Sequence, residues 1–87
     1  MKIHIDPHTL KRAKERGTNK DEIIDVINTG FSISAKQDRT GKAKVYDFEQ
    51  ERNGKYYEQK RVEVIYILEV DLIITVTVYV FYGKWVR

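Results

Sequence analysis

The sequence has no cysteine, so it can form neither a disulfide framework nor a metal site built on thiolates. That absence is typical of the reducing cytoplasm, where we expect the protein to act. No apolar run is long enough for a membrane helix, and the first residues lack the apolar core of a secretory signal. The 87 residues contain a single proline and no linker or low-complexity segment, which predicts one domain spanning residues 1–87.

Several catalytic signatures are also missing. The chain has no phosphate-binding loop, no dinucleotide fingerprint and no Ser-His-Asp arrangement, so cofactor-dependent functions have no support. Its two histidines, His4 and His8, are four residues apart, but Pro7 begins a helix between them, so they are not a helical metal-binding pair. We therefore expect neither a metal nor a cofactor.

Positive charge is concentrated at one end of the sequence. Residues 1–20 hold six lysines and arginines against two acids, a balance of +4, whereas the whole chain carries +3. A basic end on a small domain favours a polyanionic partner such as nucleic acid. The competing interpretation is a solvated surface that only keeps the protein in solution.

Two helices are predicted in the first third of the chain. Asp6-Pro7 suits a helix start and Gly17 suits a helix end, which predicts a helix over about residues 7–16. A second helix should start within residues 18–21 and close at Gly30. Its apolar face is predicted to consist of Ile23, Ile24, Val26 and Ile27.

From Phe31 onward the apolar period changes to the two-residue period of strands. Strands are expected over residues 31–37, 43–51, 56–68 and 72–82, with Asn53-Gly54 as a hairpin turn. In the last strand, one face is predicted to carry Ile74, Val76, Val78 and Val80. The other face is predicted to carry Ile73, Thr75, Thr77, Tyr79 and Phe81. The order of elements predicts an α+β fold, with two N-terminal helices packed on one face of a four-stranded twisted antiparallel sheet.

One face of the first helix carries polar side chains: His8, Arg12, Glu15 and Arg16. RNA cleavage without a metal needs a group that moves protons near neutral pH and cations that hold charge on the phosphate. His8 and the two arginines are therefore candidate catalytic residues, and Lys11 beside them is a candidate nucleic-acid contact. Leu10 and Ala13 point elsewhere and are the expected core contacts. The competing interpretation is that His8 is a structural residue at a helix start.

A second candidate surface lies on the sheet, opposite the valines, and is predicted to combine Arg61, Thr75, Thr77 and Tyr79. Hydroxyls, rings and a cation suit stacking on bases and contact with phosphates. Arg61, Thr75 and Tyr79 are therefore also candidate catalytic residues, although threonine and tyrosine are favoured strand residues in any case. The loop over residues 38–44 is expected to close over a phosphate backbone through Arg39, Lys42 and Lys44, or to be a plain hairpin turn. The tail over residues 82–87, with Trp85, either packs back on the domain or contacts a partner.

The segments "HTLKRAKERGTNKDEIIDVINTG" and "VEVIYILEVDLIITVTVY" together resemble a small bacterial family known as domain of unknown function 4258. The residues that match its pattern are His8, Arg12, Arg16-Gly17, Gly30 and Ile73-Ile74-Thr75-Val76. That family is similar in layout to the RelE-like toxins. The resemblance implies a metal-independent endoribonuclease, encoded beside an antitoxin that masks it, with His8, Arg12, Arg16 and Thr75 at matching positions.

The residues and the resemblance together predict a small RelE-like toxin that cleaves RNA and is paired with an antitoxin protein. The RNA would be cleaved either free in solution or on the ribosome. In this hypothesis His8 is the general base or acid. The alternative is a non-catalytic module of the same fold that binds nucleic acid or a protein. A third hypothesis is a homo-oligomer whose subunits contact each other through an exposed strand edge and the Trp85 tail. No membrane association is expected.

Overall fold

The computed structural model describes residues 1–85, and its sheet has the strand order β1-β5-β4-β3-β2. Along the chain the elements are β1 (Lys2–His4), α1 (Pro7–Arg16), α2 (Lys20–Thr29), β2 (Phe31–Ile33), β3 (Thr40–Arg52), β4 (Lys55–Glu69) and β5 (Leu72–Gly83). β1 runs parallel to β5, and the other neighbouring pairs are antiparallel. The fold is thus α+β with a five-stranded mixed sheet.

The predicted four-stranded antiparallel sheet was wrong, although two helices do precede the long strands. The missed strand is β1, whose three residues pair with Leu72, Ile73 and Ile74. A three-residue strand gives no readable alternation, and its partner lies at the other end of the sequence. The strand predicted over residues 31–37 was also too long, because only Phe31–Ile33 pairs with β3.

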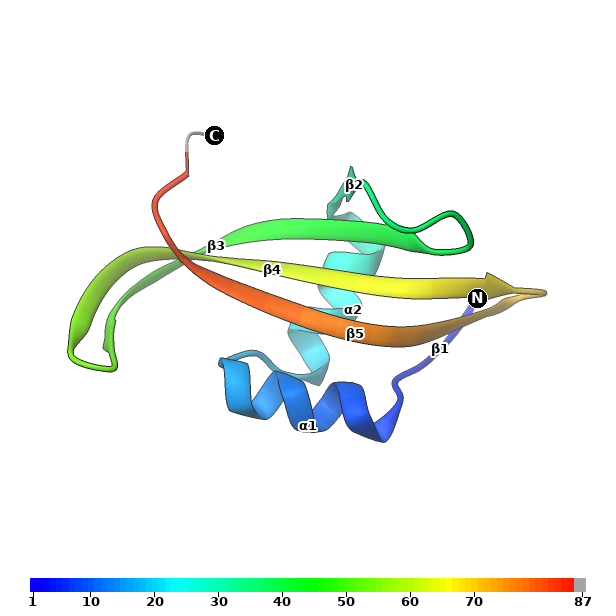
Figure 1. Ribbon diagram of the computed structural model, residues 1–87, viewed down its shortest axis with the longest axis horizontal. Helices are drawn as coiled ribbons and strands as arrows, with labels where there is room; N and C mark the ends of the chain where they lie inside the picture. The colour runs from blue at the N-terminus through cyan, green and yellow to red at the C-terminus, as the bar shows by residue number, and fades with distance from the viewer. Residues whose placement is uncertain (86–87) are drawn as a thin grey trace.

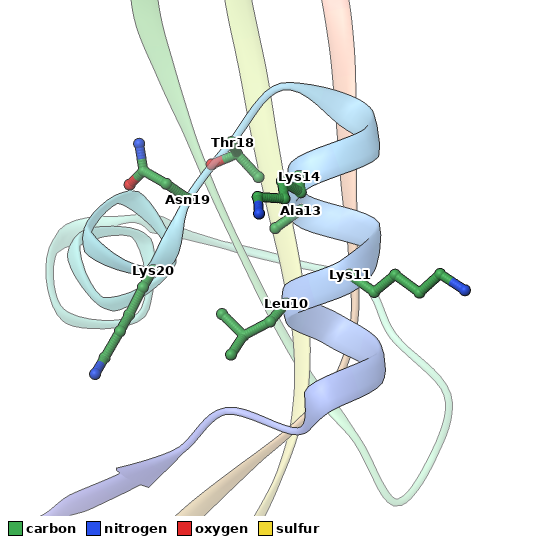
Figure 2. Close-up of a pocket in the computed structure, with 7 residues that line it drawn as sticks. All are labelled: Leu10, Lys11, Ala13, Lys14, Thr18, Asn19 and Lys20. Carbon is green, nitrogen blue, oxygen red and sulfur yellow. The ribbon is translucent and has the colours of Figure 1, made fainter.

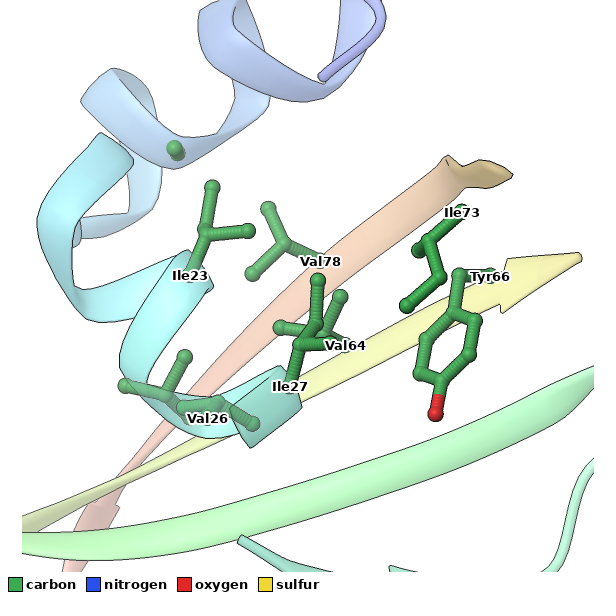
Figure 3. Close-up of a cluster of buried hydrophobic side chains, with 9 residues drawn as sticks. Ile23, Val26, Ile27, Val64, Tyr66, Ile73 and Val78 are labelled. Atoms are coloured by element: carbon green, nitrogen blue, oxygen red, sulfur yellow. The ribbon is translucent and has the colours of Figure 1, made fainter. Parts of the chain in front are cut away.

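The helices cover one face of the sheet unequally. α2 packs across β3 and β4, whereas α1 runs along β5 at the margin of the sheet, and the face toward the viewer in Figure 1 carries no helix. The core lies between the helices and the sheet, where α2 side chains meet those of β4 and β5 (Figure 3). Its members are Ala13, Ile23, Val26, Ile27, Val62, Val64, Tyr66, Ile73 and Val78. Leu10 was predicted to join this core but is exposed, and Thr9 is buried in its place.

α1 has the predicted boundaries. The Asp6 carboxylate accepts a hydrogen bond from the His8 backbone N–H at 2.8 Å, and Gly17 ends the helix at φ 95°, in the left-handed region. Three side chains from the sheet donate to the carbonyls at this end: Arg52 to Glu15, Tyr82 to Arg16 and Lys60 to Gly17. Two of these donors are cations, which suits the negative end of the helix dipole.

Gly30 follows α2 for a reason other than the predicted one. Its φ is −74°, so no left-handed conformation is needed. A Cβ added there would lie 2.5 Å from the Val26 carbonyl oxygen and 2.6 Å from that of Ala43. Glycine is therefore required by the close approach of α2 to β3.

We expect Gly30→Ala to lower the free energy of unfolding by about 1–3 kcal/mol, since both obstacles are backbone atoms and the main chain must move. Urea denaturation measures the change. Gly83→Ala is the matched control, because a Cβ there meets only the Trp85 ring at 3.6 Å, which is ordinary contact. Equal stabilities for the two variants would contradict the steric explanation.

The alternation of side chains between the two faces of the sheet is interrupted part-way along β5. Ile65 pairs with Thr77 and the next residue, Tyr66, pairs with Thr75, so Val76 is an extra residue without a partner. Such a bulge shifts the alternation by one residue. Before it Ile73 and Thr75 face the helices, and after it Val78 does. The predicted division of β5 into two uninterrupted faces was therefore wrong.

Candidate nucleic-acid interface

The face of the sheet that no helix covers, called here the open face, is defined by the strand register. Phe31 lies opposite Ala43, Ala43 opposite Glu63, and Glu63 opposite Tyr79. Directly paired residues project to the same side, so these four residues form one row across the sheet. The neighbouring rows add Val45, Arg61, Phe81, Ile65 and Thr77.

Three aromatic side chains on the open face are about half exposed. Phe31 is 49% exposed, Tyr79 42% and Phe81 48%. The Tyr79 and Phe81 rings lie 6.4 Å apart with an interplanar angle of 27°, so they follow β5 as a stacked pair. Water-exposed rings in this arrangement can accept flat ligands on their faces.

Arginines flank these rings. The Arg61 guanidinium lies 5.2 Å from the Phe31 ring centroid and donates to the Glu63 carboxylate at 2.9 Å. The Arg16 guanidinium lies 5.3 Å from the Tyr79 ring centroid and donates to the Val78 carbonyl at 2.5 Å. Each arginine is thus held beside a ring. The Arg61 charge is paired with Glu63, whereas Arg16 is in no ion pair within residues 1–85.

A pocket of about 200 Å³ lies at one end of the open face, beside the segment between β2 and β3. It is lined by Ala35, Lys36, Arg39, Ile65, Thr77 and Tyr79. The Tyr79 ring and the Ile65 side chain provide apolar surface, and Lys36 and Arg39 provide cations. The pocket therefore has the composition of a subsite for one base and its phosphate.

Arg16 joins the two surfaces that the sequence singled out. His8, Arg12 and Arg16 form one stripe on α1, spaced by single turns of about 5.4 Å. His8 and Arg12 are exposed, and Arg16 reaches from α1 to Tyr79 of the open face. Arg12 also approaches Glu15 at 3.9 Å, with both side chains half exposed. Lys11 is exposed beside the stripe.

Thr75 does not lie beside Tyr79, so that part of the prediction was wrong. The bulge turns Thr75 toward α1, where it is 3% exposed. Its hydroxyl donates to the Thr9 hydroxyl at 3.1 Å and accepts from the Asp6 backbone N–H at 3.0 Å. Thr75 thus ties the start of α1 to the sheet.

Two lysines predicted to lie in a phosphate-binding loop are in β3 instead. Lys42 donates to the Ser32 hydroxyl at 3.2 Å, and Lys44 donates to the Asp25 carboxylate at 2.7 Å, on the side of α2. Only Arg39 stays in the connecting segment. Sequence reasoning missed Lys36, because alternation alone did not show that β2 ends at Ile33 and leaves Lys36 beside the open face. It missed Phe31 because the side that Phe31 occupies is set by its pairing with Ala43.

The Asp25 carboxylate accepts hydrogen bonds from three side chains: Lys44, Tyr46 and Thr29. Hydrogen bonds from Lys44 and from the Tyr46 hydroxyl lower the pKa of Asp25 from 3.8 to about 2. Burial and the Asp25 carboxylate raise the pKa of Tyr46. The hydrogen bonds from Lys44 and Tyr46 to Asp25 thus join β3 to α2.

We expect acid to destabilise the protein in part through Asp25. The unfolded carboxylate binds a proton more readily than the folded one, so its contribution is present above about pH 4 and is lost as the pH falls to about 2. Thermal unfolding measured at both pH values should show a smaller acid-induced drop in Tm for Asp25→Asn than for the parent. Equal drops would show that the hydrogen bonds to Asp25 add nothing.

The tail packs back on the sheet as far as it is described. The Trp85 backbone N–H donates to the Gln59 side-chain oxygen at 2.6 Å, and its ring lies beside Gly83. Val86 and Arg87, which belong to the predicted tail, lie outside the described residues.

Comparison with models of known protein families, with curated proteins and with solved structures found no match. Within residues 1–85, no three histidine, aspartate or glutamate side chains are grouped so that they could hold a metal ion. Neither helix in that range has the length and apolar content to cross a membrane.

Proposed function

We propose that the protein binds single-stranded RNA on the open face of its sheet. The observation that carries this proposal is the contact of Arg16 with Tyr79, which places a basic helix stripe beside the exposed rings. Unpaired bases would stack on Tyr79, Phe81 and Phe31, while Arg16, Arg61 and Arg39 contact the phosphates between them. Paired bases hide their flat surfaces inside the duplex, so single strands should bind better than duplexes.

Tyr79→Ala should weaken binding of a single-stranded RNA of about 12 nucleotides by roughly 10–100-fold, the loss expected from one stacking contact. Fluorescence anisotropy of a labelled strand measures the change. Tyr56→Ala is the matched control, because Tyr56 is 56% exposed but lies at the far end of β3 and β4. Equal losses in both variants, or none in either, would remove the open face from consideration.

RNA cleavage is the second part of the proposal, and it is favoured by the position of His8 on the same stripe as Arg16. His8 would take the proton from a 2′-hydroxyl, whose oxygen then bonds to phosphorus as the bond to the 5′ oxygen breaks. The leaving 5′ oxygen takes up a proton from water, and Arg12 and Arg16 hold the charge on the phosphate. Incubation of the purified protein with RNA in EDTA tests this directly.

In this proposal the protein is the toxin of a toxin–antitoxin pair, as the resemblance to RelE-like toxins implies. It acts in the cytoplasm, which the absence of cysteine favours. RNA binding without any cleavage, with or without ribosomes, would instead favour a non-catalytic binding module. The two functions are therefore separated by one assay.

A further inference from the structure

A second surface lies between α1 and α2, on the side of the molecule that faces away from the open face. It is a groove of about 510 Å³ lined by Leu10, Lys11, Ala13, Lys14, Thr18, Asn19 and Lys20. Figure 2 shows Leu10 pointing into the gap between the helices, with Lys14 and Lys20 on its two sides and Lys11 directed away. An apolar floor between lysines is the composition of a docking groove.

The groove has unused binding capacity. Leu10 is 39% exposed at its floor. None of the three lysines is in an ion pair within residues 1–85, and no acidic residue lines the groove. An occupant that fits must therefore bring an apolar side chain flanked by carboxylates.

The turn between β4 and β5, called here the β4–β5 tip, has that composition. Val70 is 94% exposed and Leu68 is 59% exposed, and they alternate with Glu69 and Asp71. Lys2 lies beside Asp71 and donates its backbone N–H to the Asp71 carbonyl, so the tip also carries one cation on its β1 side. The pairing of β1 with β5 up to Leu72 holds the tip at the end of the sheet.

We propose that the groove of one copy of this chain receives the β4–β5 tip of a second copy. Val70 would pack on Leu10 and Ala13, and Glu69 and Asp71 would face Lys14 and Lys20. The two surfaces are different, so the contact is head-to-tail and can add further copies in the same way. The proposal does not depend on RNA binding, because neither surface belongs to the open face.

The test is the solution mass of RNA-free protein, measured by light scattering over a concentration series up to about 1 mM, since small contacts are weak. The mass of the parent should rise from 10.3 kDa toward twice that value or beyond. Val70→Asp and Leu10→Asp should each remain at the monomer mass. A parent that stays monomeric throughout overturns the proposal.

Reversing the charges on the two surfaces gives a sharper test of the proposed contact. A groove variant, Lys14→Glu with Lys20→Glu, and a tip variant, Glu69→Lys with Asp71→Asn, should each be monomeric alone but associate when mixed. Asparagine is used at 71 because Asp71 has φ 56°, a conformation that asparagine tolerates. Lys55→Glu, at the opposite end of β4, and Tyr79→Ala should associate as the parent does. Association that survives in the separate groove and tip variants, or that is lost with Tyr79→Ala, would place the interface elsewhere.

Discussion

His8→Ala should lower RNA cleavage by about 10²–10⁴-fold, the usual contribution of a positioned general acid or base. The fold should be unaffected, with a change in the free energy of unfolding within about 0.5 kcal/mol, as for other surface positions. His8 is exposed, and its side chain has no hydrogen-bond partner within residues 1–85. The hydrogen bond to Asp6 uses the backbone N–H, which alanine keeps.

His4→Ala is the matched control, since His4 is also exposed but lies in β1, outside the α1 stripe. Single-turnover cleavage of a labelled RNA should show near-parental rates for His4→Ala. An active His8→Ala protein would move the chemistry to the open face, with Arg61 and Tyr79 as the next candidates.

Lys60→Met should lower the free energy of unfolding by about 3 kcal/mol, because removing one partner of a buried ion pair leaves the other charge uncompensated. The Lys60 ammonium donates to the Glu22 carboxylate at 2.8 Å and to the Gly17 carbonyl at 2.9 Å, and its side chain is 11% exposed. Methionine fills similar space, but it leaves the Glu22 carboxylate, whose side chain is 22% exposed, with the Thr18 hydroxyl as its one remaining side-chain donor within residues 1–85.

A second substitution separates the effect of the unpaired charge on stability from the effect of lost packing. In Lys60→Met with Glu22→Leu the unpaired carboxylate is gone, so stability should return to within about 1 kcal/mol of the parent. Lys84→Met is the control, because the Lys84–Glu58 pair spans 3.4 Å on the surface and should be worth less than about 0.5 kcal/mol. If the double variant is no more stable than Lys60→Met alone, burial of the Glu22 charge is not the cause.

Features set by single residues were predictable from the sequence. Gly17 ends α1 in the left-handed region, and Asn53 and Gly54 have φ values of 54° and 80° in the turn between β3 and β4. Few residue types adopt these positive φ values, so glycine and asparagine at such positions predict a helix end or a tight turn. Arg61 and Tyr79 were also placed correctly on the uncovered face of the sheet.

Features set by pairing were not predictable. The bulge at Val76 could not be recognised in the sequence, because apolar and β-branched residues occur at both odd and even positions of β5. Because of this bulge, Thr75 is buried and Tyr79 is exposed. Leu10 was expected in the core because it is apolar and points away from the face that carries His8. The smaller Thr9 is buried instead, because its hydroxyl has a partner in Thr75.

The contact of Arg16 with the Val78 carbonyl has a consequence for the lifetime of the protein in solution. Beyond Ile74, no strand within residues 1–85 pairs with the outer edge of β5. Such an edge can template added strands and start aggregates, and natural proteins often protect it with a charged side chain. Arg16 occupies one carbonyl of this edge and keeps a charge over it. Removing Arg16 should therefore shorten the time before the protein precipitates, as well as weaken RNA binding.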